Sequence, residues 1–202
     1  MAKPGWLTVN PMSGSGNKTL NNSASAHTGR VARVGTVTIT GKDIAEAVTY
    51  RVTQSPLAEY VQFTDGSSMS VEKAGGKITI AGKSNSQKLT FSWVGSVADV
   101  NIPSSYTAAG AVTTNGEAIA DDPGASAEYD FSIQLELPEN DTVSAISRVL
   151  KVTADGSQYA QISIDQAAGD PTLSINVTEI TIPQDGSTVT VNVESNTSWT
   201  VA

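Results

Sequence analysis

The sequence predicts an all-β fold made of two β-sandwiches, one of them split between the N- and C-terminal segments. Short runs rich in Val, Ile and Thr alternate with polar residues between clusters of Gly, Asn and Pro, as in strands joined by turns. No segment sustains the 3.6-residue apolar period of a long helix. Similar segments recur along the 202 residues, and their order places one complete unit between two partial ones.

The ends of two units share a pattern. "RVGTVT" (33–38) and "RVLKVT" (148–153) each precede a polar turn and a second alternating strand. The second strands close at Gln54 and Gln166, and a small-residue linker with Pro follows each. A turn between two alternating runs indicates a hairpin, so two units are expected to end alike.

The beginnings of two units are also alike, because "VEKAGGKITIAGKSNS" (71–86) resembles "IPQDGSTVTVNVESNT" (182–197). We therefore expect the second part of a sandwich, a divergent complete sandwich with a long loop at 104–129, and the first part of a sandwich. Their predicted bounds are 1–55, 56–169 and 170–202.

Composition narrows the function classes. A net charge of −8 without a basic stripe argues against nucleic-acid and membrane partners. There is no Cys, and the single histidine, His27, lies in a loop rich in small residues. The acidic turn "DDPG" (121–124) lacks EF-hand spacing. We expect no enzyme activity, no metal and no cofactor.

The partial units, joined in the order C-terminal then N-terminal, resemble the BACON domain, an immunoglobulin-like sandwich of Bacteroidetes proteins. The resemblance rests on matched positions across both segments: Gly186, Ser195-Asn196, Trp199, Trp6-Leu7, Pro11, Ser13-Gly14, Asn22, Arg33, Val37 and Gln54. The middle unit keeps the pattern without the two matched Trp residues and is the divergent copy. The resemblance implies two immunoglobulin-like sandwiches.

A half-sandwich would expose strand edges and apolar side chains, so we expect the two partial units to pair. The predicted contacts between them are Trp6, Leu7, Val9, Val37, Ile39, Val191, Val193, Trp199 and Val201. Pairing within one chain and pairing between neighbouring chains both stay open. A longer tandem array interrupted at residue 202 is a third interpretation.

Two function classes follow from the resemblance. The first is a phage virion structural protein, since BACON-like domains occur in virion proteins of crAss-like phages. It would be made in the host cytoplasm and decorate the capsid exterior, with other copies of itself and the major capsid protein as partners. The second is a carbohydrate-binding module at a bacterial surface or secreted, gripping host or mucin glycans through Trp93 or Tyr106. The opening "MAKPGWLTVN" (1–10) lacks the apolar core of a signal peptide, which favours the first class.

Overall fold

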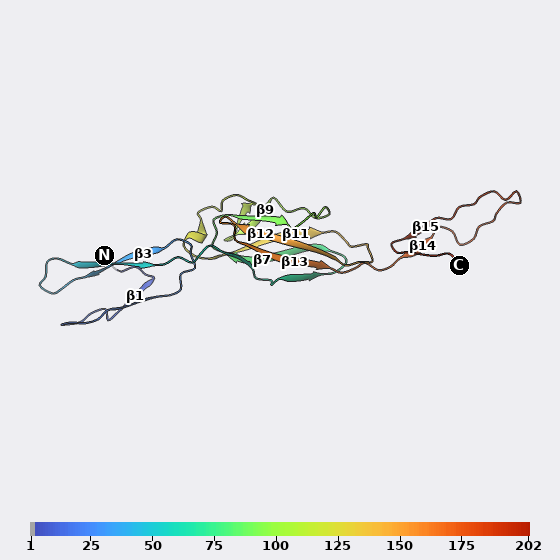
Figure 1. Ribbon diagram of the computed structural model, residues 1–202. Helices are drawn as coiled ribbons and strands as arrows, with labels where there is room; N and C mark the ends of the chain where they lie inside the picture. The colour runs from blue at the N-terminus through green and yellow to red at the C-terminus, as the bar shows by residue number, and fades with distance from the viewer. Residues whose placement is uncertain (1–2) are drawn as a thin grey trace.

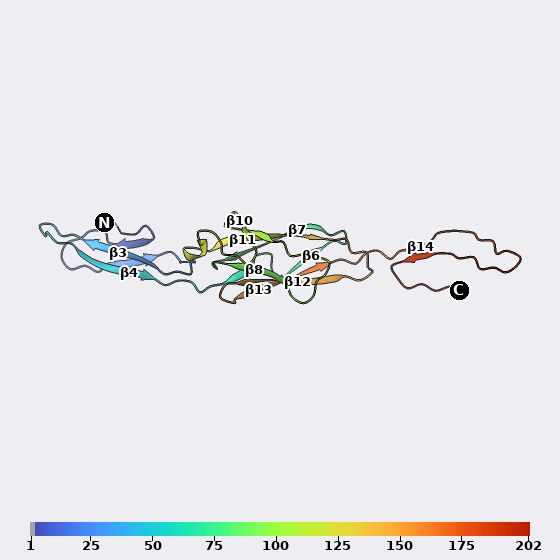
Figure 2. The same ribbon diagram turned by 90° about the horizontal axis from the view of Figure 1, so that it is seen from above.

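The computed structural model describes residues 3–202, so Met1 and Ala2, the start of the predicted segment 1–55, lie outside the described part. Strands and one short 3-10 helix make up the regular structure, and residues 3–202 contain no α-helix. The predicted all-β class is confirmed. The molecule is elongated, with an N-terminal segment, a middle sandwich and a C-terminal segment following one another along its length (Figures 1 and 2).

The N-terminal segment holds two small antiparallel sheets. Strand β1 (Leu7–Asn10) pairs with β2 (Asn21–Ala24), and β3 (Arg33–Ile39) pairs with β4 (Val48–Gln54). No other strand of residues 3–202 joins these sheets. Each sheet therefore keeps unpaired edges.

The middle sandwich consists of two packed sheets. The five-stranded sheet has the order β10-β9-β11-β7-β5 and the four-stranded sheet the order β6-β13-β12-β8. The strands of the first are β5 (Val61–Phe63), β7 (Gly76–Ser84), β9 (Ser105–Ala108), β10 (Ala111–Thr114) and β11 (Tyr129–Leu137). Those of the second are β6 (Ser68–Val71), β8 (Leu89–Trp93), β12 (Ile146–Ala154) and β13 (Tyr159–Gln166). All neighbours are antiparallel except β6 and β13, which are parallel.

Alternation along the strands builds the sandwich core. Every second side chain of β11, from Tyr129 to Leu137, is buried between the sheets. Alternation with a period of two is what places one face of a strand inward. The largest side chains buried to less than 2% exposure in this core are Ile80, Leu89, Ile133, Leu135, Leu150, Ile162 and Ile164.

The predicted loop 104–129 is partly regular structure. It contains the β9–β10 hairpin, which extends the five-stranded sheet, and the 3-10 helix η1 (Pro123–Ala125). The expectation of one long loop was wrong, because the β9–β10 hairpin interrupts it. Tyr106 and Ile119 are buried in the core and anchor the segment.

The C-terminal segment contains β14 (Leu173–Ile175) paired with β15 (Val193–Ser195) and a long connection without further strands. The N- and C-terminal segments lie at opposite ends of the molecule, with the middle sandwich between them (Figure 1). Within residues 3–202, no helix has the length and apolar character needed to cross a bilayer.

Candidate assembly interface

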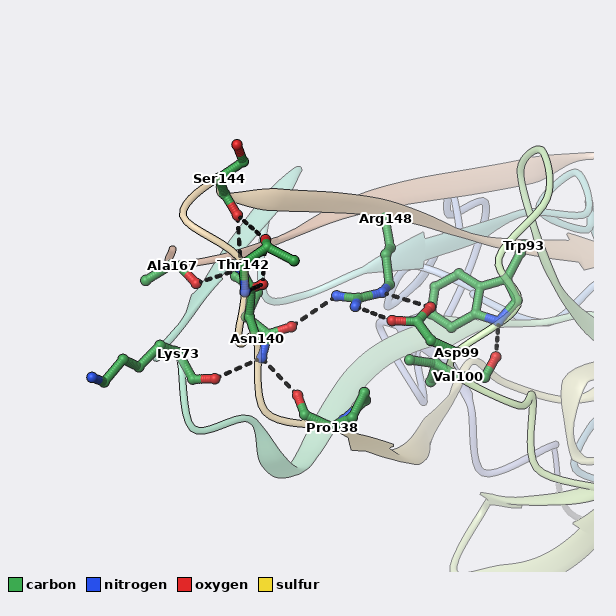
Figure 3. A network of polar contacts seen from close by, with 11 residues as sticks. Lys73, Trp93, Asp99, Val100, Pro138, Asn140, Thr142, Ser144, Arg148 and Ala167 are labelled. Atoms are coloured by element: carbon green, nitrogen blue, oxygen red, sulfur yellow. Dashed lines mark hydrogen bonds and ion pairs between the residues drawn. The ribbon is translucent and has the colours of Figure 1, made fainter. Parts of the chain in front are cut away.

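The middle unit shows how a completed unit closes. The buried guanidinium of Arg148, 3% exposed, donates through Nη1 to Gln166 Oε1 (3.0 Å) and through Nε to Asp99 Oδ1 (3.3 Å). Nη2 of Arg148 also pairs with Asp99. The hydrogen bonds from Arg148 hold the pKa of Asp99 below its usual range. Figure 3 shows the guanidinium of Arg148 beside the carboxylate of Asp99.

The side-chain amide of Gln166 ties the closing strand to both halves of the unit. Its Nε2 donates to the carbonyl oxygens of Pro138 (2.8 Å) and Lys73 (3.1 Å). Pro138 follows β11 in the second part of the unit, whereas Lys73 follows β6 in the first part. Gln166, at the end of β13, therefore makes both of these hydrogen bonds only when both parts of the unit are present.

The closing strand of the N-terminal segment has half of this arrangement. Gln54 Oε1 accepts from Arg33 Nε (2.8 Å), and Gln54 Nε2 donates to Ser25 O (2.8 Å). Within residues 3–202, Gln54 Nε2 has no second acceptor. Gln54 thus corresponds to Gln166 with the partner from the first part of the unit missing.

The two junctions between units have the same hydrogen bonds. At the first, Asn85 Oδ1 accepts from Tyr60 N (2.9 Å), and Nδ2 donates to Ala58 O and Thr28 O (both 3.2 Å). Thr28 belongs to the N-terminal segment, so Asn85 joins two units. Its burial is complete, at 0% exposed.

At the second junction, Asn196 takes the place of Asn85. Its Oδ1 accepts from Thr172 N (2.8 Å), and its Nδ2 donates to Asp170 O (2.9 Å) and to Asp141 O of the middle unit (2.7 Å). The C-terminal segment therefore opens a further unit, placed on the middle unit as the middle unit is placed on the N-terminal segment.

The first strand pair of the C-terminal segment repeats that of the middle unit in register. Leu173 and Ile175 face Ser195 and Val193, just as Val61 and Phe63 face Ser84 and Gly82. The turn before the long strand matches as well: Gly75 and Gly186 both have positive φ (65° and 73°), and their N–H groups donate to Glu72 O and Pro183 O. Residues 170–196 therefore have the backbone plan of the first part of a unit.

Several apolar side chains of the C-terminal segment are uncovered in the single chain. Val191, equivalent to the fully buried Ile80, is 37% exposed. Trp199 is 49% exposed. Val201 is more exposed still, and Val193 is half-buried. The C-terminal segment therefore has apolar side chains that no second sheet covers within residues 3–202.

The N-terminal segment also has apolar side chains, and only some of them are covered. Trp6, Leu7, Val9 and Val37, four of the residues predicted to lie at the interface, gather in one small cluster within this segment. Ile39, predicted to join them, is 42% exposed at the end of β3. No C-terminal residue of the predicted contact set touches this cluster within the described part of the chain.

The two aromatic residues predicted to touch glycans lie inside the middle unit. Tyr106 is 4% exposed and packs edge-to-face on Phe91 (ring centroids 5.0 Å apart). Trp93 is half-buried, and its indole N–H donates to Val100 O (2.8 Å). The burial of Tyr106 is incompatible with sugar stacking in this structure.

The segment 104–129 makes a junction contact that the sequence did not suggest. Backbone N–H groups of Arg30 and Val31 donate to Gly124 O (2.9 Å) and Ala125 O (3.1 Å), and the Arg30 side chain pairs with Asp122. The η1 turn thereby holds the N-terminal segment against the middle unit.

The other polar residues considered for chemistry are His27 and the acidic turn at 121–124. His27 Nε2 lies 2.7 Å from Val31 O in an exposed loop. Within residues 3–202, no group of three or more His, Cys, Asp or Glu side chains is arranged to hold a metal ion. The acidic turn at 121–124 is used by the Arg30–Asp122 pair.

A protein-family comparison identifies the N-terminal segment. Residues 1–55 match the BACON family, described as "Putative binding domain, N-terminal". This segment is therefore similar to the BACON family. The match bears out the family resemblance seen in the sequence, and no curated protein matches the chain.

Several solved structures resemble the chain at low sequence identity. A Bacteroides ovatus GH5 xyloglucanase is 13% identical with a TM-score of 0.34, over 54% of this chain and 19% of that one. A Bacteroides thetaiotaomicron protein is 20% identical with a TM-score of 0.29, over 56% and 91%. Protocadherin Gamma B7 cadherin domains are 13% identical with a TM-score of 0.39, over 94% and 47%. The chain thus spans about a fifth of the xyloglucanase it resembles.

Proposed function

We propose that the protein is a non-enzymatic structural protein that links copies of itself, and that it serves as an auxiliary decoration protein on the exterior of a phage capsid. The observation that carries the proposal is the pair of incomplete, complementary sandwiches at opposite ends of the molecule (Figure 1). A protein with such ends is suited to joining subunits, because each end offers unpaired strands and apolar side chains.

The chemistry of the described residues supports a structural role. Polar networks such as Arg148–Gln166–Asp99 join strands to one another and have their partners within the fold. The matched family is a binding-type domain. Its BACON segment supplies surfaces for association.

The proposed setting follows from the family resemblance. BACON-like domains occur in virion proteins of crAss-like phages, and an acidic, elongated β-protein fits a lattice on a capsid surface. The proposed partners are other copies of the chain and the major capsid protein. The proposed location is the virion exterior, after synthesis in the host cytoplasm.

Co-sedimentation tests this role. Purified protein is mixed with purified capsids of a crAss-like phage, and the bound fraction is measured against capsids of an unrelated phage. Saturable binding to the first alone is expected. Binding to neither, or to both equally, would contradict the capsid role.

A second candidate is a carbohydrate-binding module of a bacterial surface or secreted protein. The family description as a binding domain favours it. Micromolar binding on a glycan array, without binding to capsids, would place this function first. Loss of that binding in Trp93→Ala with the fold retained would locate the sugar site.

A further inference from the structure

We infer that the C-terminal segment of a second copy of this chain completes the N-terminal segment, in the strand register of the middle unit, so that copies join head to tail. The inference deepens the proposed function and rests on its self-association part. It specifies the partner, the strands that pair and the residues that face each other.

The parallel pair β6–β13 provides the template. In the middle unit Ser68, Met69, Ser70 and Val71 lie beside Ser163, Ile164, Asp165 and Gln166. This pair joins the first part of the unit to its closing strand. The edge of β4 that corresponds to it is unpaired in residues 3–202.

Shared hydrogen bonds fix the equivalent residues. The matching turns at Gly75 and Gly186 make Ile182 the equivalent of Val71 and Glu179 that of Ser68. On the closing strand, Gln54 corresponds to Gln166, so that Arg51 corresponds to Ser163. In the completed unit, residues 179–182 of one copy lie parallel to residues 51–54 of the other.

This register brings opposite charges together. Arg51 of one copy faces Glu179 of the other, at the position of Ser163 and Ser68. Both side chains are exposed in the single chain. Opposite charges on neighbouring strands stabilise a pair, and like charges there destabilise it. The charges therefore favour this register.

The same register gives the side-chain amide of Gln54 a second hydrogen-bond acceptor. In the middle unit Gln166 Nε2 donates to Lys73 O (3.1 Å) in addition to Pro138 O. The equivalent of Lys73 is Gln184. A second copy would present the Gln184 carbonyl to the Nε2 group of Gln54.

Apolar faces also match. Val52 is half-buried, whereas its equivalent Ile164 is fully buried in the middle unit. The residue that would lie beside Val52 is Ile180, which is 43% exposed in the single chain. Pairing would cover both side chains, and burial of apolar surface is the main favourable term in association.

The chain's own C-terminal segment is held away from its N-terminal segment. The linker after β4 is pinned by Leu57 N donating to Gly29 O (2.9 Å), and the linker after β13 by Gly169 N donating to Thr142 O (2.7 Å). Asn85 and Asn196 fix the next residues of each junction. The middle unit therefore separates the segments, and a second copy is the occupant we assign.

Cysteine pairing tests the register, since the natural chain has no Cys. Thr53 and Thr181, both exposed, are equivalent to the neighbours Asp165 and Ser70. Adjacent strands lie about 4.8 Å apart, within disulfide reach. Full-length Thr53→Cys is mixed with full-length Thr181→Cys under mild oxidation, and disulfide-linked heterodimers are counted on non-reducing gels.

Thr49→Cys is the matched control, because Thr49 lies four residues earlier on the same strand and is also exposed. That offset is about 13 Å, beyond disulfide reach. We expect at least ten-fold more heterodimer from Thr53→Cys than from Thr49→Cys. Equal yields, or none from either, would overturn the inference. The double variant Thr53→Cys/Thr181→Cys should give a ladder of oligomers, and a cross-linked monomer would overturn it as well.

A charge exchange provides an independent readout. Arg51→Glu alone and Glu179→Arg alone should each weaken oligomer formation several-fold in sedimentation velocity. Their mixture should restore it, because the carboxylate introduced at position 51 of one variant then faces the guanidinium introduced at position 179 of the other. Lys77→Glu, at an exposed lysine of the middle unit, should have no effect. No weakening in either single variant contradicts the register.

These measurements use purified protein alone. Failure of capsid binding with correct cross-links would remove the proposed setting and leave the pairing intact. Capsid binding without register-specific cross-links would overturn the pairing and leave the proposed setting intact.

Discussion

Asn85 and Asn196 occupy the same position at two successive junctions and make the same set of hydrogen bonds. The side-chain amide of each donates to two carbonyl oxygens, one in the linker between the units and one in the preceding unit. Its oxygen accepts from the backbone N–H of the residue two positions after the linker carbonyl. One amide side chain thus fixes how each unit sits on the one before it. The repeat governs the placement of units as well as their internal fold.

The first prediction concerns this junction. Asn85→Ala leaves Tyr60 N, Ala58 O and Thr28 O without their side-chain partner. The free energy of unfolding should fall by about 1–3 kcal/mol, the penalty for unsatisfied buried polar groups. Urea unfolding followed by Trp fluorescence measures it. Asn101→Ala, at an exposed Asn of the same unit, is the control, and an equal effect in both would refute the junction role.

The second prediction concerns Trp199. Because Trp199 is 49% exposed in the single chain, Trp199→Ala should change the unfolding free energy of dilute, monomeric protein by less than about 1 kcal/mol. Association should weaken at least ten-fold, as measured by sedimentation velocity. Val112→Ala, at an exposed apolar residue of the middle unit, should affect neither quantity. A loss of about 3 kcal/mol or more in the monomer would mean that Trp199 packs within its own chain.

The third prediction concerns pH. Hydrogen bonds from Arg148 lower the pKa of Asp99 in the folded state. The ionised carboxylate therefore contributes stability above the unfolded-state pKa of about 3.9, and the contribution is lost as pH falls through the folded-state pKa. Asp99→Asn should lower the unfolding free energy at pH 7 by about 1–2 kcal/mol, since Asp99 is partly exposed and screened.

The difference between Asp99→Asn and the natural protein should shrink as pH falls below about 4, the usual range of an Asp carboxyl. Urea unfolding across the acidic range up to neutral pH measures it. Asp130→Asn, at an exposed Asp of the middle unit, is the control. A difference that stays constant across this range would rule out the linkage.

The fourth prediction concerns a chain that ends at residue 169. It keeps every strand of the middle sandwich and the unpaired edges of β3 and β4, but it lacks the C-terminal segment 170–202. It should not form head-to-tail oligomers, and added peptide 170–202 should bind it and raise its melting temperature. Calorimetry and light scattering measure both effects. Indifference to the peptide would end the split-domain interpretation.

The sequence predicted the parts of the fold that depend on local alternation. Strands β4 and β13 end at Gln54 and Gln166 as expected, because polar-apolar alternation fixes both the strand and its inward face. The likeness of 71–86 to 182–197 also holds in three dimensions, where matching turns and strand pairs follow each other in the same register.

The alignment of Arg33 with Arg148 was wrong by two residues. Arg33 lies opposite Gln54, whereas Arg148 lies opposite Ile164. Both guanidinium groups still reach the closing Gln, because an Arg side chain is long enough to bond directly across or diagonally. The sequence similarity reflects the Arg–Gln hydrogen bond that both units share, and it does not reflect the strand register.

Two site predictions depended on tertiary context that no local pattern carries. Tyr106 is buried because β9 pairs with β11 inside the five-stranded sheet, in a segment that the sequence predicted to be a loop. Ile39 is exposed because nothing in residues 3–202 covers the end of β3. The signal for the junctions was present in the repeated Ser-Asn pairs, Ser84-Asn85 and Ser195-Asn196, and its structural use became visible only with the hydrogen bonds.

The parallel pairing of β6 with β13 has a mechanical consequence. The chain enters the middle unit just before β5 and β6 and leaves it just after β13, at opposite ends of the sandwich (Figure 1). Tension applied along the molecule pulls these two parallel strands past each other, so the load falls on all of their hydrogen bonds at once. Such a shear arrangement resists stretching far better than a hairpin that unzips one bond at a time. Strands donated between copies in the same register would carry the same load, and tensile strength would continue across each joint.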